Sequence, residues 1–222
     1  IGFCYPFEKA TVSPLKTSVS ELKRRMLLEE SEQEAAVPVW LNQATKQKSS
    51  EKSAGISGAE RGSLYHKMLE LLPFTQVSSA EDLRKFKDDL VNSGRMTREE
   101  ADCIEIDKLQ LFLESPLAER IRSAACEGKL KREQPFVLGI TTEESGGDYE
   151  LIQGIIDLYF EEADGIVLLD YKTDRVGQAA ELAERYRIQL EYYVQAICQI
   201  TGKPVKEIYI YSLYLSQTIR LE

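Results

Sequence analysis

The sequence predicts an α/β fold, in which a central mixed sheet is flanked by helices and joined to a helical N-terminal portion. Helix-start signals dominate the first half of the chain, and segments rich in strand-forming residues dominate the second half. A long stripe of residues at helical spacing interrupts those strands. The chain has 222 residues, enough for one domain with a sizeable core. We therefore expect a single domain over residues 1–222.

The predicted helices begin at a Ser or Thr that is followed three residues later by an acidic residue, the spacing of a capping box. Such pairs begin at Ser18, Ser57, Ser79 and Thr97. They predict a charged helix of about ten residues, a helix that ends near Pro73, and a largely helical region from Ser79 to Glu127. Residues 42–54 are rich in Ser, Lys and Gln, which predicts a mobile linker.

The predicted strands are rich in β-branched, aromatic and leucine residues. They cover residues 134–140, 149–160, 166–172 and 206–214. The turn sequence 145–148 separates the first two strands, and a helix over Gln178–Ile200 separates the last two. This order favours helices packed on a sheet.

A predicted hairpin brings two carboxylates together. Glu161–Gly165 contains an Asp-Gly pair and joins the second and third strands. If Glu161 pairs with Ile166, residue numbers across the ladder sum to a constant, and Asp157 lies directly opposite Asp170. Their Cβ atoms would then be about 5 Å apart.

Lys172 completes this face of the hairpin. Side chains alternate along a strand, so Lys172 points the same way as Asp170, while Tyr171 points away and leaves its carbonyl near the site. Two carboxylates this close repel each other, and a hard cation such as Mg²⁺ neutralises them most directly. The lysine can orient or help deprotonate an attacking water, or stabilise charge on a phosphate. The pattern predicts a divalent-metal site that cuts a phosphodiester.

The alternative is a surface hairpin whose Asp and Lys form a solvated pair. The acids interrupt the apolar runs Ile155-Ile156 and Val167–Leu169. An unpaired carboxylate beside a core is costly, so the metal site is the better interpretation.

His66 is the only histidine of the chain. It lies in the middle of the helix predicted after Ser57, with Gly62 one turn earlier on the same face. The missing side chain there lets a backbone or a nucleic-acid strand come close. A single helical histidine is more often a satisfied core or surface residue. Beside the acidic hairpin it is better explained as an imidazole ligand.

The helix after the hairpin carries a stripe that contains one glutamine. Its members are Leu182, Tyr186, Gln189, Tyr193 and Ile197. A glutamine in such a stripe needs a hydrogen-bonding partner, which could be a carboxylate of the site, a water or DNA. The alternative is a helix that packs on the sheet with Gln189 at its margin.

Five ordered motifs combine these residues. They are Gly62-x-x-x-His66, Glu133-x-Pro-Phe136, Gly154-x-x-Asp157, Asp170-Tyr171-Lys172-Thr173 and Gln189-x-x-x-Tyr193. Together they resemble the RecB-like branch of the PD-(D/E)xK nucleases, and within it the C-terminal nuclease domains of AddA subunits of bacterial AddAB helicase-nucleases. The resemblance covers most of the chain, from Ser18–Lys23 to the strand near Ile208. It implies a restriction-endonuclease-like core.

The resemblance also implies the role of each site residue. The metal ligands would be His66, Asp157, Asp170 and the backbone carbonyl of Tyr171; Lys172 would be the catalytic lysine, and Gln189 and Tyr193 would support the site. Glu133 is a weaker match, because an acidic residue before a buried strand has many structural explanations. The core pattern is complete, which implies an active nuclease.

The implied cofactor is Mg²⁺, which Mn²⁺ or Ca²⁺ can replace in binding. Some relatives hold an iron–sulfur cluster with three clustered C-terminal cysteines, which this chain lacks, so no such cluster is expected. The implied partners are single-stranded DNA, the helicase domains of a longer chain that thread the strand, and the AddB subunit. The implied process is recombinational repair of double-strand breaks.

Composition adds further expectations. The four cysteines are dispersed, so neither a zinc site nor a disulfide framework is indicated. The net charge of −9 argues against tight DNA binding by the chain alone. We find no apolar run near the roughly 20 residues that span a bilayer and no secretory leader, which predicts a cytoplasmic protein. The start at Ile1 suggests a fragment of a larger subunit.

The sequence therefore predicts a metal-dependent deoxyribonuclease, with exonuclease activity on unwound single strands. One alternative is a non-catalytic scaffold that binds DNA or a partner protein through a nuclease fold. The other is an autonomous restriction or repair nuclease, which should bind duplex DNA alone.

Overall fold

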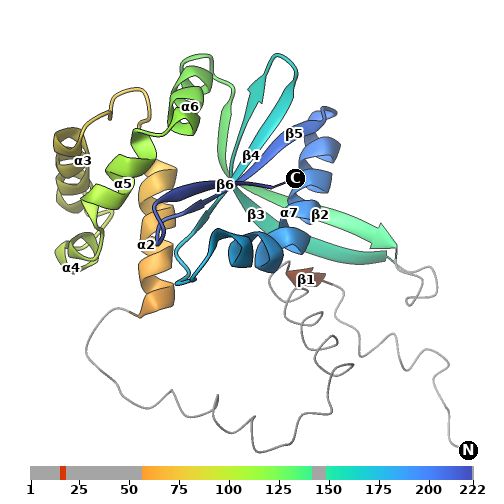
Figure 1. Ribbon diagram of the computed structural model, residues 1–222, viewed down its shortest axis with the longest axis horizontal. Helices are drawn as coiled ribbons and strands as arrows, with labels where there is room; N and C mark the ends of the chain where they lie inside the picture. The colour runs from red at the N-terminus through yellow and green to blue at the C-terminus, as the bar shows by residue number, and fades with distance from the viewer. Residues whose placement is uncertain (1–15, 19–56, 142–148, 222) are drawn as a thin grey trace, which may run out of the picture. The chain divides into compact units, whose positions relative to one another are not determined.

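The computed structural model describes residues 16–18, 57–141 and 149–221 (Figure 1). The helix expected after Ser18, the linker expected at 42–54 and the turn expected at 145–148 lie outside the described residues. The chain divides into two compact units. The described part of the first is residues 16–18, 135–141 and 149–155, and that of the second is residues 57–134 and 156–221. All of the predicted site residues belong to the second unit.

The first three helices of the second unit begin at the predicted capping signals, and the other three lie in the regions predicted to be helical. They are α2 (Gly58–Leu71), α3 (Ala80–Asn92), α4 (Arg98–Asp102), α5 (Ile106–Leu113), α6 (Pro116–Cys126) and α7 (Ala179–Thr201). At the first three, the Ser or Thr side chain accepts the backbone N–H three residues on, and the acidic side chain accepts the backbone N–H of the cap. These reciprocal bonds satisfy amides that have no partner inside the helix.

The strands form a mixed sheet, as predicted. They are β1 (Lys16–Ser18), β2 (Leu130–Thr141), β3 (Tyr149–Glu162), β4 (Gly165–Lys172), β5 (Val205–Ser212) and β6 (Gln217–Leu221). In the second unit, β4 pairs antiparallel with β3 and parallel with β5, and β6 pairs antiparallel with β5. The parallel pair requires a crossover, which α7 provides. In the first unit, β1 pairs parallel with the start of β3, from Lys16↔Leu151 to Ser18↔Gln153.

The hairpin register is the predicted one, because Glu161 pairs with Ile166. Two strands were not predicted. β1 is three residues long, and β6 follows β5 after a short turn, too short for a clear alternating pattern.

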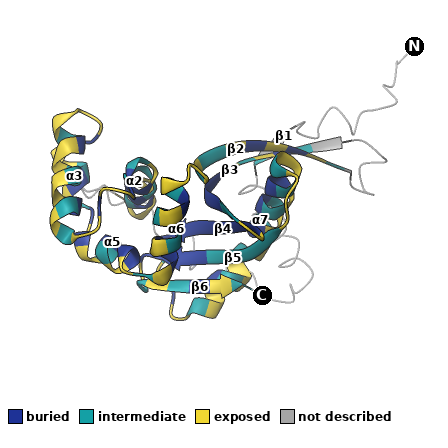
Figure 2. Cartoon of the chain, turned by 90° about the horizontal axis from the view of Figure 1, so that it is seen from above, coloured by how far each residue is buried: buried dark blue, intermediate teal, exposed yellow. Residues whose placement is uncertain are grey.

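The core of the second unit fixes β4 between two layers. Helices α2 to α6 cover one side of the strands and α7 the other (Figures 1 and 2). Alternate residues of β4, Val167, Leu169 and Tyr171, belong to the cluster that packs against the α2–α6 layer. Burial of one such leucine stabilises the fold by about 1.5–3 kcal/mol. β4 is therefore a rigid support for the residues at its end. No helix in the described ranges is long and apolar enough to cross a membrane.

Candidate active site

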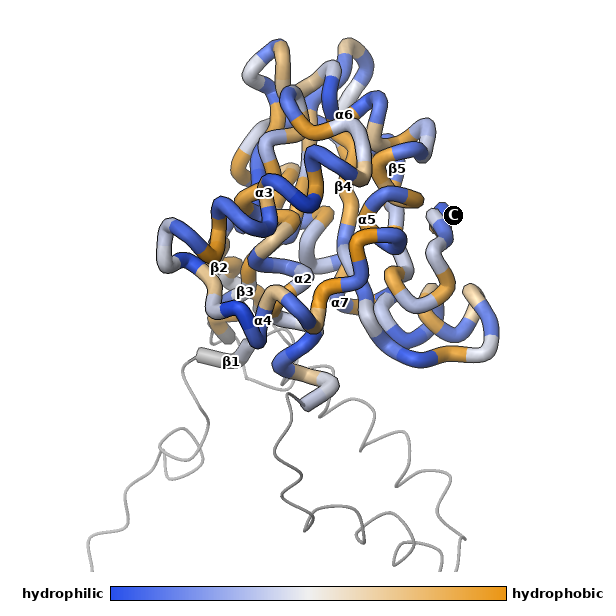
Figure 3. Tube along the Cα trace, turned by 90° about the vertical axis from the view of Figure 1, so that its left-hand side faces the viewer, coloured by the Kyte–Doolittle hydropathy of each residue, from blue (hydrophilic) through white to orange (hydrophobic). Residues whose placement is uncertain are grey.

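Two charged residues are buried at the end of β4. Every residue of the strand is buried, and the apolar run Ile166–Leu169 leads directly into Asp170. Figure 3 shows the hydrophobic stretch at β4. Asp170 is 1% exposed and Lys172 is 9% exposed. Lys172 Nζ lies 2.6 Å from Asp170 Oδ2. Residues two apart point to one face of a strand, so the two side chains share a face, as predicted.

Lys172 is the partner of Asp170 that the structure shows. Within the described ranges, neither carboxylate oxygen of Asp170 accepts a hydrogen bond of normal geometry, although Lys172 Nζ lies 2.6 Å from Oδ2. Burial raises the pKa of Asp170 to about 6, against the charge of Lys172, which lowers it. A buried carboxylate in this state is stabilised by a further cation or donor.

β3 brings a second carboxylate to the same end of the sheet. Its ladder with β4 ends at the pair Leu158↔Leu169, and Asp157 is the next residue. Asp157 Oδ2 accepts the backbone N–H of Tyr171 at 2.8 Å. The side chain is therefore fixed against the backbone between Asp170 and Lys172.

His66 contacts the other oxygen of Asp157 from α2. Its Nδ1 lies 3.3 Å from Asp157 Oδ1. Burial lowers the pKa of His66, but the hydrogen bond and charge of Asp157 outweigh it and raise this pKa above its ordinary value. Burial likewise raises the pKa of Asp157, and the interaction with His66 outweighs it and holds this pKa below its ordinary value. A metal cation bound to the imidazole would take the place of its proton.

Glu133 joins this pair from β2. Possible ligand atoms of His66, Glu133 and Asp157 lie within 4.8 Å of one another. Burial and the charge of Asp157 raise the pKa of Glu133 to about 7. Its φ of 45° lies in the left-handed region, which costs a residue with a Cβ roughly 1–2 kcal/mol. Strain and like-charge repulsion at one residue are common where a ligand compensates for them.

The donor set fits a divalent cation. Carboxylate oxygens suit Mg²⁺, Ca²⁺ and Mn²⁺, and a neutral imidazole is a common metal ligand. Asp170 is not in the group of three, but its two unbonded oxygens could complete the ligand set. Ligation by the Tyr171 carbonyl stays a prediction. The Tyr171 side chain points away, as predicted, and packs edge-on against Phe112 with ring centres 5.5 Å apart.

A close approach of α2 to the end of β4 positions His66. A Cβ at Gly62 would lie 2.8 Å from Thr173 Oγ1, too short for a real contact. Gly62 therefore allows the helix to pack directly on the residue after Lys172. The sequence predicted that a backbone or a nucleic-acid strand comes close to Gly62, and the structure places the side chain of Thr173 there.

α7 supplies the remaining predicted residues. Gln189 Nε2 donates a hydrogen bond to the hydroxyl oxygen of Tyr193 at 2.6 Å. Tyr193 is thus the hydrogen-bonding partner that a glutamine in this stripe requires. Tyr193 is 5% exposed, and burial followed by the charge of Asp170 raises its pKa. Both residues therefore belong to the layer behind Asp170.

The structure also places Tyr186 at the site, a role that the sequence did not predict. Lys172 Nζ lies 4.1 Å from the centre of the Tyr186 ring. The Tyr186 hydroxyl donates to Asp174 Oδ2 at 2.8 Å, and Arg185 Nη1 donates to Asp174 Oδ1 at 3.2 Å. Tyr186 stood in the predicted stripe, but helical spacing alone does not separate a residue that contacts the lysine from one that fills the core.

Residues 39–218 match the family described as the PD-(D/E)XK nuclease superfamily. The match covers most of the chain, so the chain belongs to the PD-(D/E)XK nuclease superfamily. This confirms the predicted fold family.

Relatives within that superfamily are named as the A subunit of an ATP-dependent helicase/nuclease. The protein of Lachnoclostridium phytofermentans is 35% identical over 300 residues, which cover 100% of this chain and 22% of the relative. That of Thermoanaerobacter sp. (strain X514) is 36% identical, over 96% of this chain and 18% of the relative. The protein of Clostridium botulinum (strain Langeland) is 33% identical, over 100% of this chain and 18% of the relative. The chain thus spans about a fifth of the length of these relatives.

Proposed function

We propose that this chain is a Mg²⁺-dependent deoxyribonuclease domain that hydrolyses phosphodiesters of single-stranded DNA. The observation that carries the proposal is the buried contact of Asp170 with Lys172 beside the group formed by His66, Glu133 and Asp157. A buried lysine next to several carboxylates is costly for folding alone. It is the arrangement expected where a phosphate, a metal and a water meet.

In this mechanism His66, Glu133, Asp157 and Asp170 would hold the metal, with the Tyr171 carbonyl as a further ligand. A divalent cation held there would supply a Lewis acid for the scissile phosphate and for a water molecule. Lys172 orients the attacking water and balances the negative charge that grows on the phosphate oxygens. Asp170 and the ring of Tyr186 hold the lysine ammonium in place from two sides. Gln189 and Tyr193 support Asp170 from α7.

We further propose that the domain works within a longer helicase-nuclease. Its relatives are named helicase/nuclease subunits, and the chain corresponds to about a fifth of their length. Helicase domains of the same subunit would deliver the unwound strand, and an AddB-type subunit would be the partner. The net charge of −9 supports delivery of DNA by other domains, since the chain has no overall positive field to attract it. The process would be exonucleolytic break repair in the cytoplasm.

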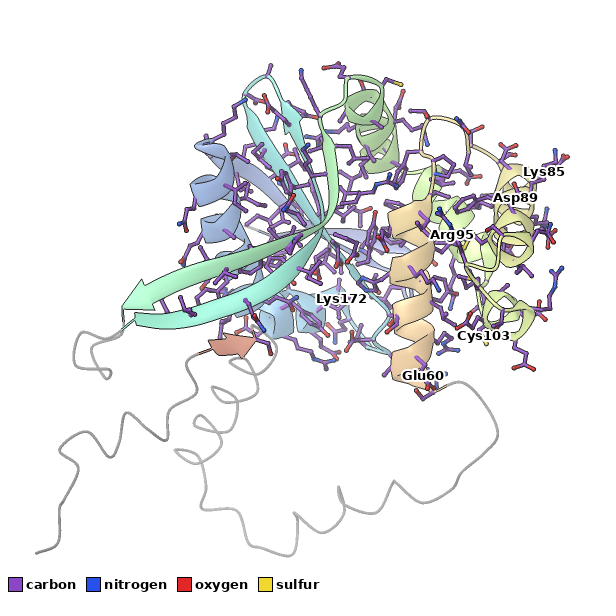
Figure 4. The ribbon with its side chains drawn as sticks, turned by 180° about the vertical axis from the view of Figure 1, so that it is seen from behind. Glu60, Lys85, Asp89, Arg95, Cys103 and Lys172 are labelled. Carbon is purple, nitrogen blue, oxygen red and sulfur yellow. The ribbon has the colours of Figure 1, made fainter. Side chains whose placement is uncertain are left out.

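The test is cleavage of end-labelled single-stranded DNA with Mg²⁺, without metal, and with excess chelator. Wild type is compared with Asp170→Asn and with the control Asp89→Asn, an exposed residue of α3 (Figure 4). We expect wild type and Asp89→Asn to cleave the DNA when Mg²⁺ is present. Neither should cleave it without metal or with excess chelator. The cleavage rate of Asp170→Asn should fall by about 10²–10³-fold, the scale of losing one preorganised electrostatic contact. Equal cleavage by Asp170→Asn would show that the chemistry lies elsewhere. Mn²⁺ binding without cleavage by the wild type would favour the non-catalytic scaffold or a requirement for the helicase domains.

A further inference from the structure

A pocket of about 590 Å³ opens between the first turn of α2 and the segment that follows β4. It is lined by Gly58, Ala59, Arg61, Thr173, Asp174 and Arg175. None of these residues is among the proposed metal ligands. The contact of Gly62 with Thr173 joins the two segments that form the pocket.

The pocket carries two cations, Arg61 and Arg175, that no residue in the described part of the chain neutralises. Within the described ranges, neither Arg61 nor Arg175 forms an ion pair, whereas Arg120 and Arg185 each do. The one acidic lining residue, Asp174, is already bound by Arg185 and Tyr186. The backbone N–H groups of Gly58 and Ala59, at the start of α2, have no acceptor inside the helix. The pocket therefore presents an excess of donors and of positive charge.

Chain geometry places the pocket beside the candidate active site. Thr173 directly follows Lys172. Arg61 and His66 lie five residues apart on α2, which is about 7.5 Å along the helix axis. That separation is of the order of the distance between neighbouring phosphates of an extended single strand.

We propose that this pocket binds a second phosphodiester of the DNA strand, next to the scissile one, through Arg61, Arg175 and the Thr173 hydroxyl. This inference rests on the proposed function. Guanidinium groups bind phosphate oxygens through paired N–H donors, and helix-start amides add further donors. The contact fixes the register of the strand over Lys172. Because it does not read bases, it is independent of sequence.

The test measures binding, so that it does not depend on cleavage. Fluorescence anisotropy with a labelled oligodeoxynucleotide in Ca²⁺ and low salt compares wild type with the double variant Arg61→Gln/Arg175→Gln. The control, Arg84→Gln/Arg95→Gln, removes the same charge from two exposed arginines outside the pocket, of which Figure 4 labels Arg95. We expect the pocket variant to bind at least 10-fold more weakly and the control to stay within twofold of wild type. Mn²⁺ binding by calorimetry should be the same in all three proteins.

A second binding experiment identifies which phosphate of the DNA strand contacts the pocket. A set of oligonucleotides, each with one neutral methylphosphonate linkage, is bound to wild type and to the pocket variant. One linkage should weaken binding to wild type and have no further effect on the pocket variant, because that contact is already lost. The salt dependence of log K should also be shallower in the pocket variant, by about 0.7 per lost phosphate contact.

The outcomes separate this inference from the proposed function. Equal DNA affinity of the pocket variant and the control, with Mn²⁺ binding intact, overturns the phosphate pocket and leaves the nuclease proposal standing. A wild type that binds neither Mn²⁺ nor DNA overturns both.

Discussion

Glu133 has the least favourable backbone and electrostatic environment at the candidate site. Its backbone is in the left-handed region, and burial next to Asp157 raises its pKa to about 7. In the unfolded chain its pKa returns to near 4.5. The folded state therefore binds more protons than the unfolded state between these values, and the stability of the metal-free protein falls as pH rises through this window.

We predict that Glu133→Gln stabilises the metal-free protein at pH 8 by about 1 kcal/mol, after allowance for the partial exposure of the side chain. This should raise Tm by roughly 2–4 °C, and the gain should shrink as the pH is lowered to 5, where Glu133 is already protonated. Thermal unfolding at the two pH values measures it. With saturating Mn²⁺ the wild type should be more stable than Glu133→Gln, because the metal stabilises the protein that binds it more tightly. A variant that is equally destabilised at both pH values and unaffected by Mn²⁺ would assign Glu133 a purely structural role.

A substitution of Lys172 can distinguish the cleavage step from metal binding, because Lys172 is proposed to act in cleavage without binding the metal. We predict that Lys172→Gln reduces cleavage by about 10²–10⁴-fold, because the water loses its orienting group and the phosphate its balancing charge. Mn²⁺ affinity should fall by no more than threefold, since the ammonium is not a ligand. Single-turnover cleavage and calorimetry give the two quantities. Lys85→Gln on α3, an exposed lysine paired with Glu81, is the control (Figure 4). Parallel loss of metal binding and cleavage would make Lys172 a structural partner of Asp170.

At the scale of elements, the packing of α2 against the end of β4 depends on Gly62. We predict that Gly62→Ala destabilises the chain by about 1–3 kcal/mol, because a methyl group there meets the stiff side chain of Thr173. Mn²⁺ affinity should fall with it, since His66 is on the same helix. Denaturant unfolding and calorimetry measure the two effects.

Two further variants test whether the contact with Thr173 causes the loss of stability in Gly62→Ala. A Cβ at Gly58, in the same helix, meets nothing within 4 Å, so Gly58→Ala should be neutral or slightly stabilising. Adding Thr173→Ala to Gly62→Ala should restore most of the lost stability, because it removes the clashing hydroxyl. No rescue in the double variant would place the cost of Gly62→Ala somewhere other than this contact.

Most elements could be predicted, because their signals are local. Capping boxes mark the starts of α2, α3 and α4, and the hairpin turn sets the register of Glu161 with Ile166. The contacts of Tyr186 with Lys172 and of Gly62 with Thr173 depend on how α7 and α2 pack on the sheet. Such packing joins residues far apart in the sequence and leaves no periodic pattern, so these contacts required the structure.

At the scale of the whole chain, net charge limits DNA binding. With −9 charges the protein repels a polyanion except where local cations offset the repulsion. We predict that the chain alone binds single-stranded DNA with Kd no tighter than about 1 µM at 150 mM salt, the range of non-specific contacts. Anisotropy titrations with and without Ca²⁺ measure it. Nanomolar binding of duplex DNA would instead favour an autonomous restriction or repair nuclease.

The proposed function depends on a divalent cation that His66, Glu133, Asp157 and Asp170 bind together. Anomalous diffraction from crystals soaked in Mn²⁺ can locate this cation independently of activity. We expect one strong peak within bonding distance of His66, Asp157 and Glu133, and no such peak in crystals of Asp157→Asn treated in the same way. A peak remote from these residues, or none at a Mn²⁺ concentration that supports cleavage, would contradict the proposed metal site.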